Sequence, residues 1–126
     1  MKQRDLLIIG GGSAGMAAAL AAYDKGIRDI LILERNEFLG GILNQCIHNG
    51  FGLALFKEEL TGPEFADRFI EKIKEKGIEY KLNTYVTSIS SDKIVTLSSE
   101  DGGVEEIQAK AIVMAAGCYE RNAGAI

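Results

Sequence analysis

The sequence has few of the residues that mark a disulfide scaffold, a metal centre or a disordered chain. It contains two cysteines, one histidine, one proline and no tryptophan among 126 residues. Two cysteines do not make a disulfide framework, and a zinc site needs at least three protein ligands. Low-complexity segments are absent as well, which argues against disorder apart from the ends of the chain. We therefore expect one small folded domain.

Clustered positive charge and long apolar runs are also missing. The net charge is −4, which argues against a surface for nucleic acid or for an anionic membrane. The apolar run at residues 6–9 is too short to span a bilayer, and no clear signal-peptide cleavage site follows it. The sequence predicts a cytoplasmic protein that neither binds nucleic acid nor inserts into a membrane.

The first part of the chain predicts a strand, a helix and a second strand. Residues 6–9 and 30–33 are continuous apolar runs, typical of parallel strands that are covered on both faces. Residues 13–25 are rich in small helix formers, and Gly26 follows as a helix stop. This order predicts a βαβ unit with a right-handed crossover.

A long loop and a second helix are expected next. Residues 35–56 are glycine-rich and have no clear period, so they predict a loop. Residues 61–64 offer a capping box with proline in the first turn, and an apolar stripe that includes Phe65 and Phe69 follows. The helix should end at Gly77, before a short parallel strand at 79–82.

The pattern changes in the last third of the sequence. Residues 85–89, 94–97 and 105–109 alternate apolar and polar residues and are separated by turn residues. This predicts a three-stranded antiparallel meander at about 84–110. Residues 111–115 form another continuous apolar run, which predicts a separate buried strand. The fold class is therefore α/β, with a Rossmann-like parallel sheet and an added meander.

Three glycines follow the first predicted strand in the pattern G-x-G-x-x-G. Gly10 permits a tight turn, Gly12 lets the backbone approach a pyrophosphate, and Gly15 lets the helix pack closely on the strand. The small residues Ser13 and Ala14 leave the N–H groups of the first helical turn accessible to phosphate. An incidental glycine-rich turn is the simpler alternative, but it does not require a strand before the loop and a helix after it.

Glu34 stands at the end of the second predicted strand. A carboxylate there can accept hydrogen bonds from both ribose hydroxyls of an adenosine, and it would repel a 2′-phosphate. Together with the glycines it predicts that residues 5–34 bind the ADP half of a dinucleotide. At this point NAD and FAD fit equally well.

The residues also resemble a known family. Residues 5–19, the pair Glu34-Arg35 and the glycines at 40–41 are similar to the N-terminal part of the pyridine nucleotide–disulfide oxidoreductase superfamily, whose members are FAD-containing flavoproteins. Residues 111–117 match a second signature, with Ala116 where threonine is usual. The resemblance covers essentially residues 1–126. It implies the N-terminal part of an FAD-binding domain, because a meander replaces the crossover helix of plain NAD-binding domains.

The resemblance also implies positions for the cofactor. It places the pyrophosphate on residues 12–15, the adenosine ribose on Glu34 and the adenine against the backbone of Val86. Gly41 to Cys46 would run past the flavin side. The cofactor-binding residues that it implies are Gly10, Gly12, Ser13, Ala14, Gly15, Glu34, Arg35, Gly41, Cys46, Val86, Ala115, Ala116 and Gly117.

The cysteines separate this sequence from the disulfide reductases of the superfamily. Those enzymes need two thiols beside the flavin, and this loop has only Cys46. The sequence is therefore similar to a branch without the dithiol, which includes flavoproteins like opine or amine oxidase subunits and proteins associated with glycerol-3-phosphate oxidation. A redox pair of Cys46 with Cys118 and proton transfer by His48 stay open beside simple free thiols and a loop hydrogen bond. No residue is assigned a catalytic role.

The resemblance implies a longer enzyme. In the family an NAD-binding domain follows the second signature, and the chain later returns to complete the FAD domain. We therefore expect the N-terminal part of an FAD-dependent, NAD(P)H-linked oxidoreductase with a small-molecule substrate, inactive and weakly flavin-binding by itself. Residues 111–115 should then lie at an exposed sheet edge that favours self-association. Two alternatives are a non-catalytic nucleotide-binding subunit of a heteromeric flavoenzyme and an NAD-binding Rossmann dehydrogenase domain.

Overall fold

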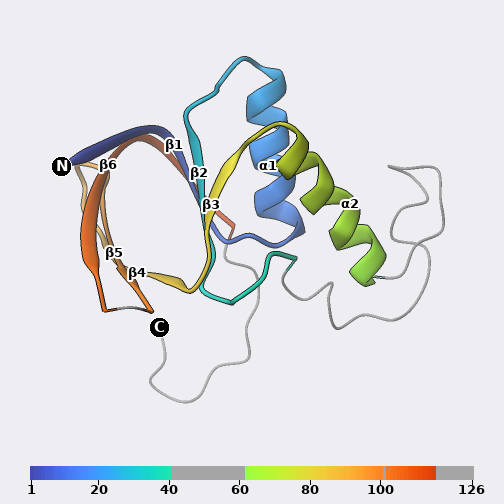
Figure 1. Ribbon diagram of the computed structural model, residues 1–126. Helices are drawn as coiled ribbons and strands as arrows, with labels where there is room; N and C mark the ends of the chain where they lie inside the picture. Colours follow the sequence, from blue (N-terminus) through green and yellow to red (C-terminus); the bar gives the residue numbers. More distant parts are fainter. Residues whose placement is uncertain (41–61, 101, 116–126) are drawn as a thin grey trace.

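The computed structural model describes residues 1–40, 62–100 and 102–115. These residues form one mixed sheet of six strands with two helices (Figure 1). In chain order the elements are β1 (Lys2–Ile9), α1 (Ser13–Asp24), β2 (Ile30–Leu33), α2 (Gly62–Glu75), β3 (Glu79–Lys81), β4 (Thr84–Ile89), β5 (Ile94–Ser99) and β6 (Val104–Met114).

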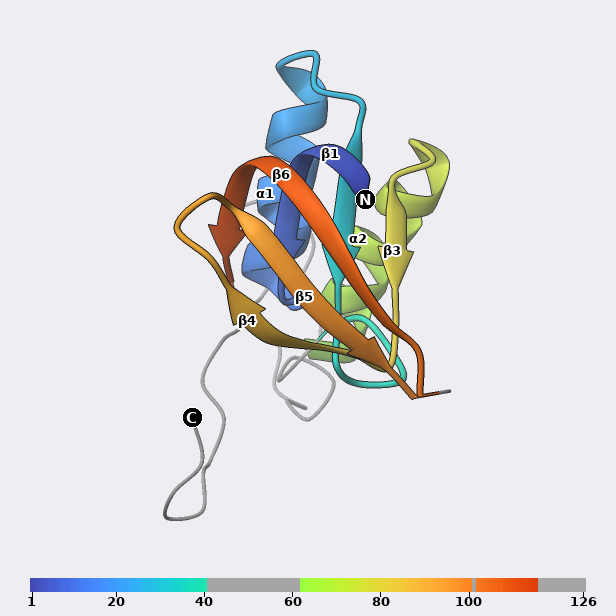
Figure 2. The same ribbon diagram turned by 90° about the vertical axis from the view of Figure 1, so that its left-hand side faces the viewer.

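The sheet has the order β3-β2-β1-β6-β5-β4. The neighbours from β3 to β6 are parallel, whereas β6, β5 and β4 are antiparallel. Figure 2 shows β6 lying between β1 and β5, where it joins the two parts of the sheet. This arrangement confirms the α/β fold class with a parallel sheet and a three-stranded meander.

Both helices pack on the same face of the parallel strands (Figure 1). The side chains on this face come from alternate positions of β1 and β2, namely Leu6, Ile8, Ile30 and Ile32. They contact Met16 and Ala19 of α1 and Phe69 and Ile73 of α2, and this confirms Phe69 as a core residue. The two helices are therefore fixed on the sheet by one apolar cluster.

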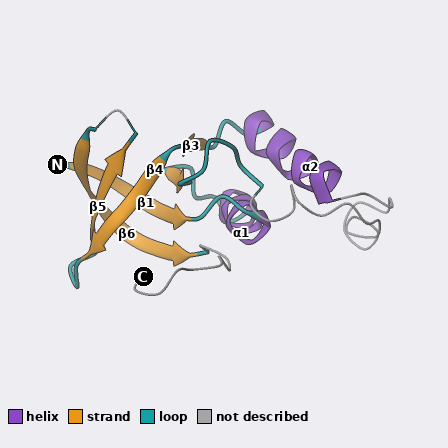
Figure 3. Cartoon of the chain, turned by 90° about the horizontal axis from the view of Figure 1, so that it is seen from below, coloured by secondary structure: helices purple, strands orange, loops and turns teal. Residues whose placement is uncertain are grey.

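The meander covers the other face of the same strands. Leu7, Leu31 and Leu33 pack against residues of β5 and β6, which are Val95, Leu97, Ile107 and Ala109. Seen from below, the sheet curves so that the meander and the helices lie on opposite sides of β1 (Figure 3). Because both faces of the sheet are covered at residues 6–9 of β1 and 30–33 of β2, these segments are continuous apolar runs rather than alternating ones.

Two expectations from the sequence are wrong, and both concern residues 105–115. Residues 105–109 and 111–115 were expected as two strands, but β6 runs without a break through Val104–Met114. Its first half pairs with β5, and its second half pairs with β1 alone among the described residues. The expected full burial is wrong too, since Met114 is 63% exposed and residues 112 and 113 are only partly buried. β1 lies beside β6 from Ile107 to Met114, whereas β5 pairs with β6 only as far as Gln108. The change of pattern at residue 110 therefore marks the loss of one neighbouring strand among the described residues and not the end of a strand.

The remaining boundaries agree with the sequence to within a few residues. The helix stops are confirmed, since Gly26 and Gly77, each the second residue after its helix, have φ values of 101° and 69°. β1 begins earlier than expected, and β5 ends later. The capping box with Thr61, the side chain of Phe65 and most of the predicted loop at 35–56 lie outside the described residues.

Candidate functional site

The glycine loop, residues 10–15, connects the carboxyl end of β1 to α1. Gly10 has a φ of 110°, which a side chain would strain, and its N–H donates to the Leu33 carbonyl of β2 at 2.8 Å. Gly12 then caps α1, and its carbonyl accepts the N–H of Met16 at 3.0 Å. The loop therefore turns tightly at the edge of the sheet between β1 and β2.

Two positions in the loop leave no room for a side chain. A Cβ on Gly15 would lie 1.8 Å from the carbonyl oxygen of Gly10, so α1 approaches β1 as closely as the backbone allows. A Cβ on Gly11 would lie 2.5 Å from Leu39 Cδ2 and 3.1 Å from Glu34 Oε1. The predicted role of Gly15 in close packing of the helix is thus seen in the structure.

The first turn of α1 is suited to an anion. Among the described residues no side chain caps its N–H groups, and the turn itself contains no acidic residue. Ala14 is exposed and Ser13 is half-buried. The first turn of α1 therefore contributes no carboxylate that would neutralise the partial positive charge of the helix end, and this fits a phosphate or pyrophosphate.

Glu34 lies beside the glycine loop and is only 1% exposed. Its Oε1 accepts the N–H of Gly11 and its Oε2 accepts the N–H of Asn36, each at 2.8 Å. The sequence placed this acid correctly at the end of β2, but it did not indicate either backbone donor. Each carboxylate oxygen has a second lone pair, so the group keeps acceptor capacity for the hydroxyls of a sugar.

The structure also describes three further predicted residues, Ala115, Val86 and Arg35. The N–H of Ala115 donates to the carbonyl of Ile9 at 2.8 Å, which holds residue 115 at the end of β1, next to Gly10. Val86 lies on β4, and its half-buried side chain packs on the cluster that contains Leu31 and Leu33. Arg35 is exposed and directly follows Glu34.

The segment after β2 also contacts the loop. The N–H of Gly40 donates to the Gly11 carbonyl at 2.8 Å, and Gly40 forms a parallel bridge with Gly12. Sequence reasoning did not find this contact. The predicted site residues Gly41, Cys46, Ala116 and Gly117 lie outside the described residues, as do His48 and Cys118.

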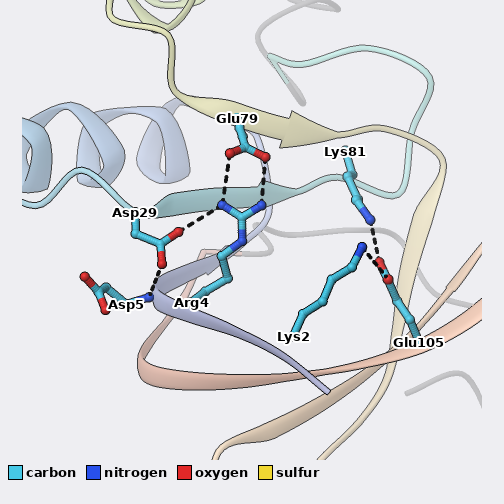
Figure 4. Close-up of polar contacts among 7 residues, drawn as sticks. All are labelled: Lys2, Arg4, Asp5, Asp29, Glu79, Lys81 and Glu105. Atoms are coloured by element: carbon cyan, nitrogen blue, oxygen red, sulfur yellow. Dashed lines mark hydrogen bonds and ion pairs between the residues drawn. The ribbon is translucent and has the colours of Figure 1, made fainter.

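The amino ends of the parallel strands carry a charged cluster, shown in Figure 4. Arg4 donates to both carboxylate oxygens of Glu79, at 3.1 and 2.7 Å, and to Asp29 at 3.0 Å. The hydrogen bond from Arg4 lowers the pKa of Glu79 below its usual value and raises the pKa of Arg4. This cluster ties β1 to β3 at the end of the sheet opposite the glycine loop.

Glu105 carries a second charged contact (Figure 4). It pairs with Lys81 and, at 3.2 Å, with Lys2. The hydrogen bond from Lys81, followed by that from Lys2, lowers the pKa of Glu105. These contacts join the start of β6 to β1 and β3.

Comparison with known proteins identifies the family. Residues 4–125 match the family model described as pyridine nucleotide-disulphide oxidoreductase. The chain belongs to this family. The resemblance to this superfamily that the sequence showed is thereby confirmed.

Individual relatives agree with this assignment. The thioredoxin reductase of Listeria innocua is 30% identical over 96% of this chain and 36% of its own length. Hydrogen cyanide synthase subunit HcnB of Pseudomonas protegens is 28% identical over 92% of this chain and 25% of its own length. The crystal structure of thioredoxin reductase from Streptococcus pyogenes superposes with a TM-score of 0.73 and 28% identity, covering 97% of this chain and 38% of that one. The chain thus spans about a quarter to just over a third of the length of these relatives.

Neither α1 nor α2 has the length and apolar character that crossing a bilayer demands. The described part of the chain therefore shows no such helix.

Proposed function

We propose that this chain binds the ADP moiety of FAD and forms the N-terminal part, residues 1–126, of the FAD-binding domain of an oxidoreductase. One observation carries the proposal. An acid-free helix end at Gly12–Gly15 and a buried carboxylate, Glu34, are joined by the hydrogen bond from the Gly11 N–H. The first suits a pyrophosphate and the second suits the hydroxyls of a ribose.

Each group of this site has a separate task in binding. The N–H groups of residues 12–15 bind the pyrophosphate, and Glu34 accepts hydrogen bonds from the adenosine ribose. The backbone of Val86 faces the adenine, while Arg35, Gly41, Cys46 and residues 115–117 line other parts of the cofactor. When bound, FAD supplies the electron-transfer chemistry, and the residues of this chain hold and orient it.

The proposal extends to the whole protein. Its family description supports NAD(P)H as the electron donor, with a small molecule as the second substrate. The absence of a second cysteine beside Cys46 supports the branch without a dithiol. We assign the protein to the cytoplasm. Residues 111–114, which pair only with β1 in the described part, supply an edge for self-association.

A second candidate is a nucleotide-binding subunit of a heteromeric enzyme. It is favoured by the relative HcnB, which is itself named as a subunit of a synthase. Purification from the native source distinguishes the two candidate functions. A second polypeptide in fixed proportion to this one supports the subunit, whereas a single polypeptide that oxidises NAD(P)H supports the complete enzyme.

The binding of FAD is tested directly by titration, with the quenching of flavin fluorescence as the signal. ADP should displace FAD, whereas FMN, which lacks the adenosine and one of the two phosphates, should not. Displacement by FMN and not by ADP would refute the proposal. NADH serves as a second competitor, and binding of NADH in preference to FAD would assign the site to a nicotinamide cofactor instead.

A charge substitution in α1 tests the position of the pyrophosphate. Ala14→Glu places an acid in the first turn of the helix, where it should lower the affinity for FAD about tenfold by repelling the pyrophosphate. The melting temperature should stay the same or rise, because an acid at this end favours the helix. Ala21→Glu makes the same charge change on an exposed position near the other end of α1. Equal loss of affinity in both variants would contradict the predicted position.

A further inference from the structure

The turn between β3 and β4 reaches the loop that follows β2. Asn83 in this turn has a φ of 51°, in the left-handed region that glycine and asparagine enter most easily. Its N–H donates to the carbonyl of Asn36 at 2.9 Å, and its own carbonyl accepts the N–H of Glu100 at 3.0 Å. The backbone of one residue thereby connects the end of β5 with the segment beside Glu34.

The same turn holds the main chain of Glu34 on both sides. The N–H of Glu34 donates to the Lys81 carbonyl at 2.9 Å, and the N–H of Thr84 donates to the Glu34 carbonyl at 3.0 Å. The N–H of Asn36 in turn donates to Glu34 Oε2 at 2.8 Å. Asn36 therefore contacts the turn through its carbonyl and the carboxylate through its N–H.

A left-handed residue between Lys81 and Thr84 makes this set of bonds possible. The turn must direct the N–H of residue 83 toward Asn36 while the N–H of Thr84 reaches Glu34. A side chain with a strong preference for negative φ would favour another turn conformation. The carbonyl of Asn36 would then lose the hydrogen bond that it accepts from the Asn83 N–H. The N–H of Asn36 would no longer be held against Glu34 Oε2.

We propose that Asn83 is a positioning residue for the nucleotide. Its left-handed backbone keeps Asn36 in place, and Asn36 fixes the Glu34 carboxylate in the orientation that accepts the adenosine ribose hydroxyls. This inference rests on the proposed function. It makes recognition of the ribose depend on the meander, far along the chain from the glycine loop.

The test compares the affinity for ADP with the affinity for 2′-deoxy-ADP, because their ratio reports the contact with the ribose hydroxyl. The unaltered chain should prefer ADP about tenfold, the value of one hydrogen bond to a charged acceptor. Asn83→Ala should reduce this ratio toward one, since alanine is strained at positive φ. Asn83→Gly should keep the ratio, because glycine adopts the same φ without strain.

Lys93 provides a matched control. It also has a positive φ, 62°, but it lies in the β4–β5 turn and is exposed. Lys93→Ala should lower the melting temperature much as Asn83→Ala does, and it should leave the ratio unchanged. In a Glu34→Gln background the ratio should already be close to one, and Asn83→Ala should not change it further.

Several results would overturn the inference. If Asn83→Ala lowers the melting temperature and keeps the preference for ADP, the turn has only a structural role. If the unaltered chain binds ADP and 2′-deoxy-ADP equally, Glu34 does not accept a hydrogen bond from the ribose 2′-hydroxyl. If it binds neither, the proposed function itself fails, and this inference fails with it.

Hydrogen exchange of the unaltered chain gives a test that requires no variant. Bound ADP should slow exchange of the amides of Asn36 and Asn83 together with that of Gly11, because one set of bonds holds all three. The Lys93 amide, which donates to the Ser90 carbonyl at 3.0 Å, should not respond. Slower exchange at Gly11 alone would overturn the inference even if Asn83→Ala does not fold.

Discussion

The two ends of the same parallel strands are held by different kinds of contact. At the amino ends, Arg4 joins Glu79 and Asp29 through side-chain ion pairs, and Glu79 is 62% exposed. At the carboxyl ends of β1 and β2, the contacts are backbone hydrogen bonds and one buried carboxylate, Glu34. The comparison distinguishes the contacts that hold the sheet together from those that shape the proposed binding site.

This difference has an energetic consequence. Exposed ion pairs contribute little, because water and salt screen the charges and the side chains lose entropy. A buried acceptor that loses part of its capacity leaves backbone N–H groups without a partner, which costs considerably more. The carboxyl ends should therefore tolerate far fewer substitutions than the amino ends.

The largest effect is expected at Gly15. Gly15→Ala should lower the free energy of unfolding by more than about 3 kcal/mol, since the new Cβ meets the Gly10 carbonyl at 1.8 Å and α1 must move away from β1. Gly26→Ala is the matched control, because its Cβ would meet nothing within 4 Å and only its φ of 101° is strained. That control should cost about 1 kcal/mol. Urea denaturation measures both, and equal costs would refute the close packing of α1.

A smaller effect separates the two kinds of glutamate. Glu34→Gln should cost about 2 kcal/mol, since glutamine has one acceptor oxygen for the two N–H groups of Gly11 and Asn36. Glu79→Gln makes the same chemical change at the exposed end and should cost less than about 1 kcal/mol. Urea denaturation of the two variants decides this comparison. A larger loss of unfolding free energy in Glu79→Gln than in Glu34→Gln would contradict it.

The smallest effect is a dependence on acid. Arg4 lowers the pKa of Glu79, and Lys81 with Lys2 lowers that of Glu105, so both carboxylates stabilise the fold in their charged form. This contribution is complete above the usual glutamate pKa of 4.5 and is lost as the pH falls through the lower folded-state values. Because Glu79 is largely exposed, its part should stay below about 1 kcal/mol.

Thermal melts at a series of pH values measure this dependence. The melting temperature should change little from about pH 7 to about pH 5 and should fall in more acidic solution. Glu79→Gln should reduce the fall, whereas Glu71→Gln, at an exposed position of α2, should not. An acid response that is the same in all three proteins would show that the Arg4 cluster does not contribute.

The βαβ unit was predictable because its signals are local. Continuous apolar runs, a glycine pattern and an acid after the second strand each reflect one neighbouring element, and β2 was placed at its observed bounds. The strand break predicted at Lys110 was wrong. A strand that loses one of its two neighbouring strands changes its sequence pattern without ending. A polar residue without turn-forming neighbours was the signal that β6 continues.

The contacts around Glu34 could not be predicted from the sequence. Its donors are backbone N–H groups of Gly11 and Asn36, which any residue except proline supplies. The turn at Asn83 gave a weak signal, since asparagine tolerates a positive φ. That signal shows where a turn lies, but it does not show which distant loop the turn contacts.

The position of β6 beside β1 also determines when the fold can form. Lys2 pairs with Ile107 and Ile9 pairs with Met114, so the first strand meets a partner from near the other end of the described chain. Such distant pairing delays folding, because a long loop must close before the contact is made. During synthesis one apolar face of β1 and β2 stays exposed to solvent until β5 and β6 have left the ribosome. Early termination before residue 104 should therefore yield an aggregation-prone chain rather than a smaller folded one.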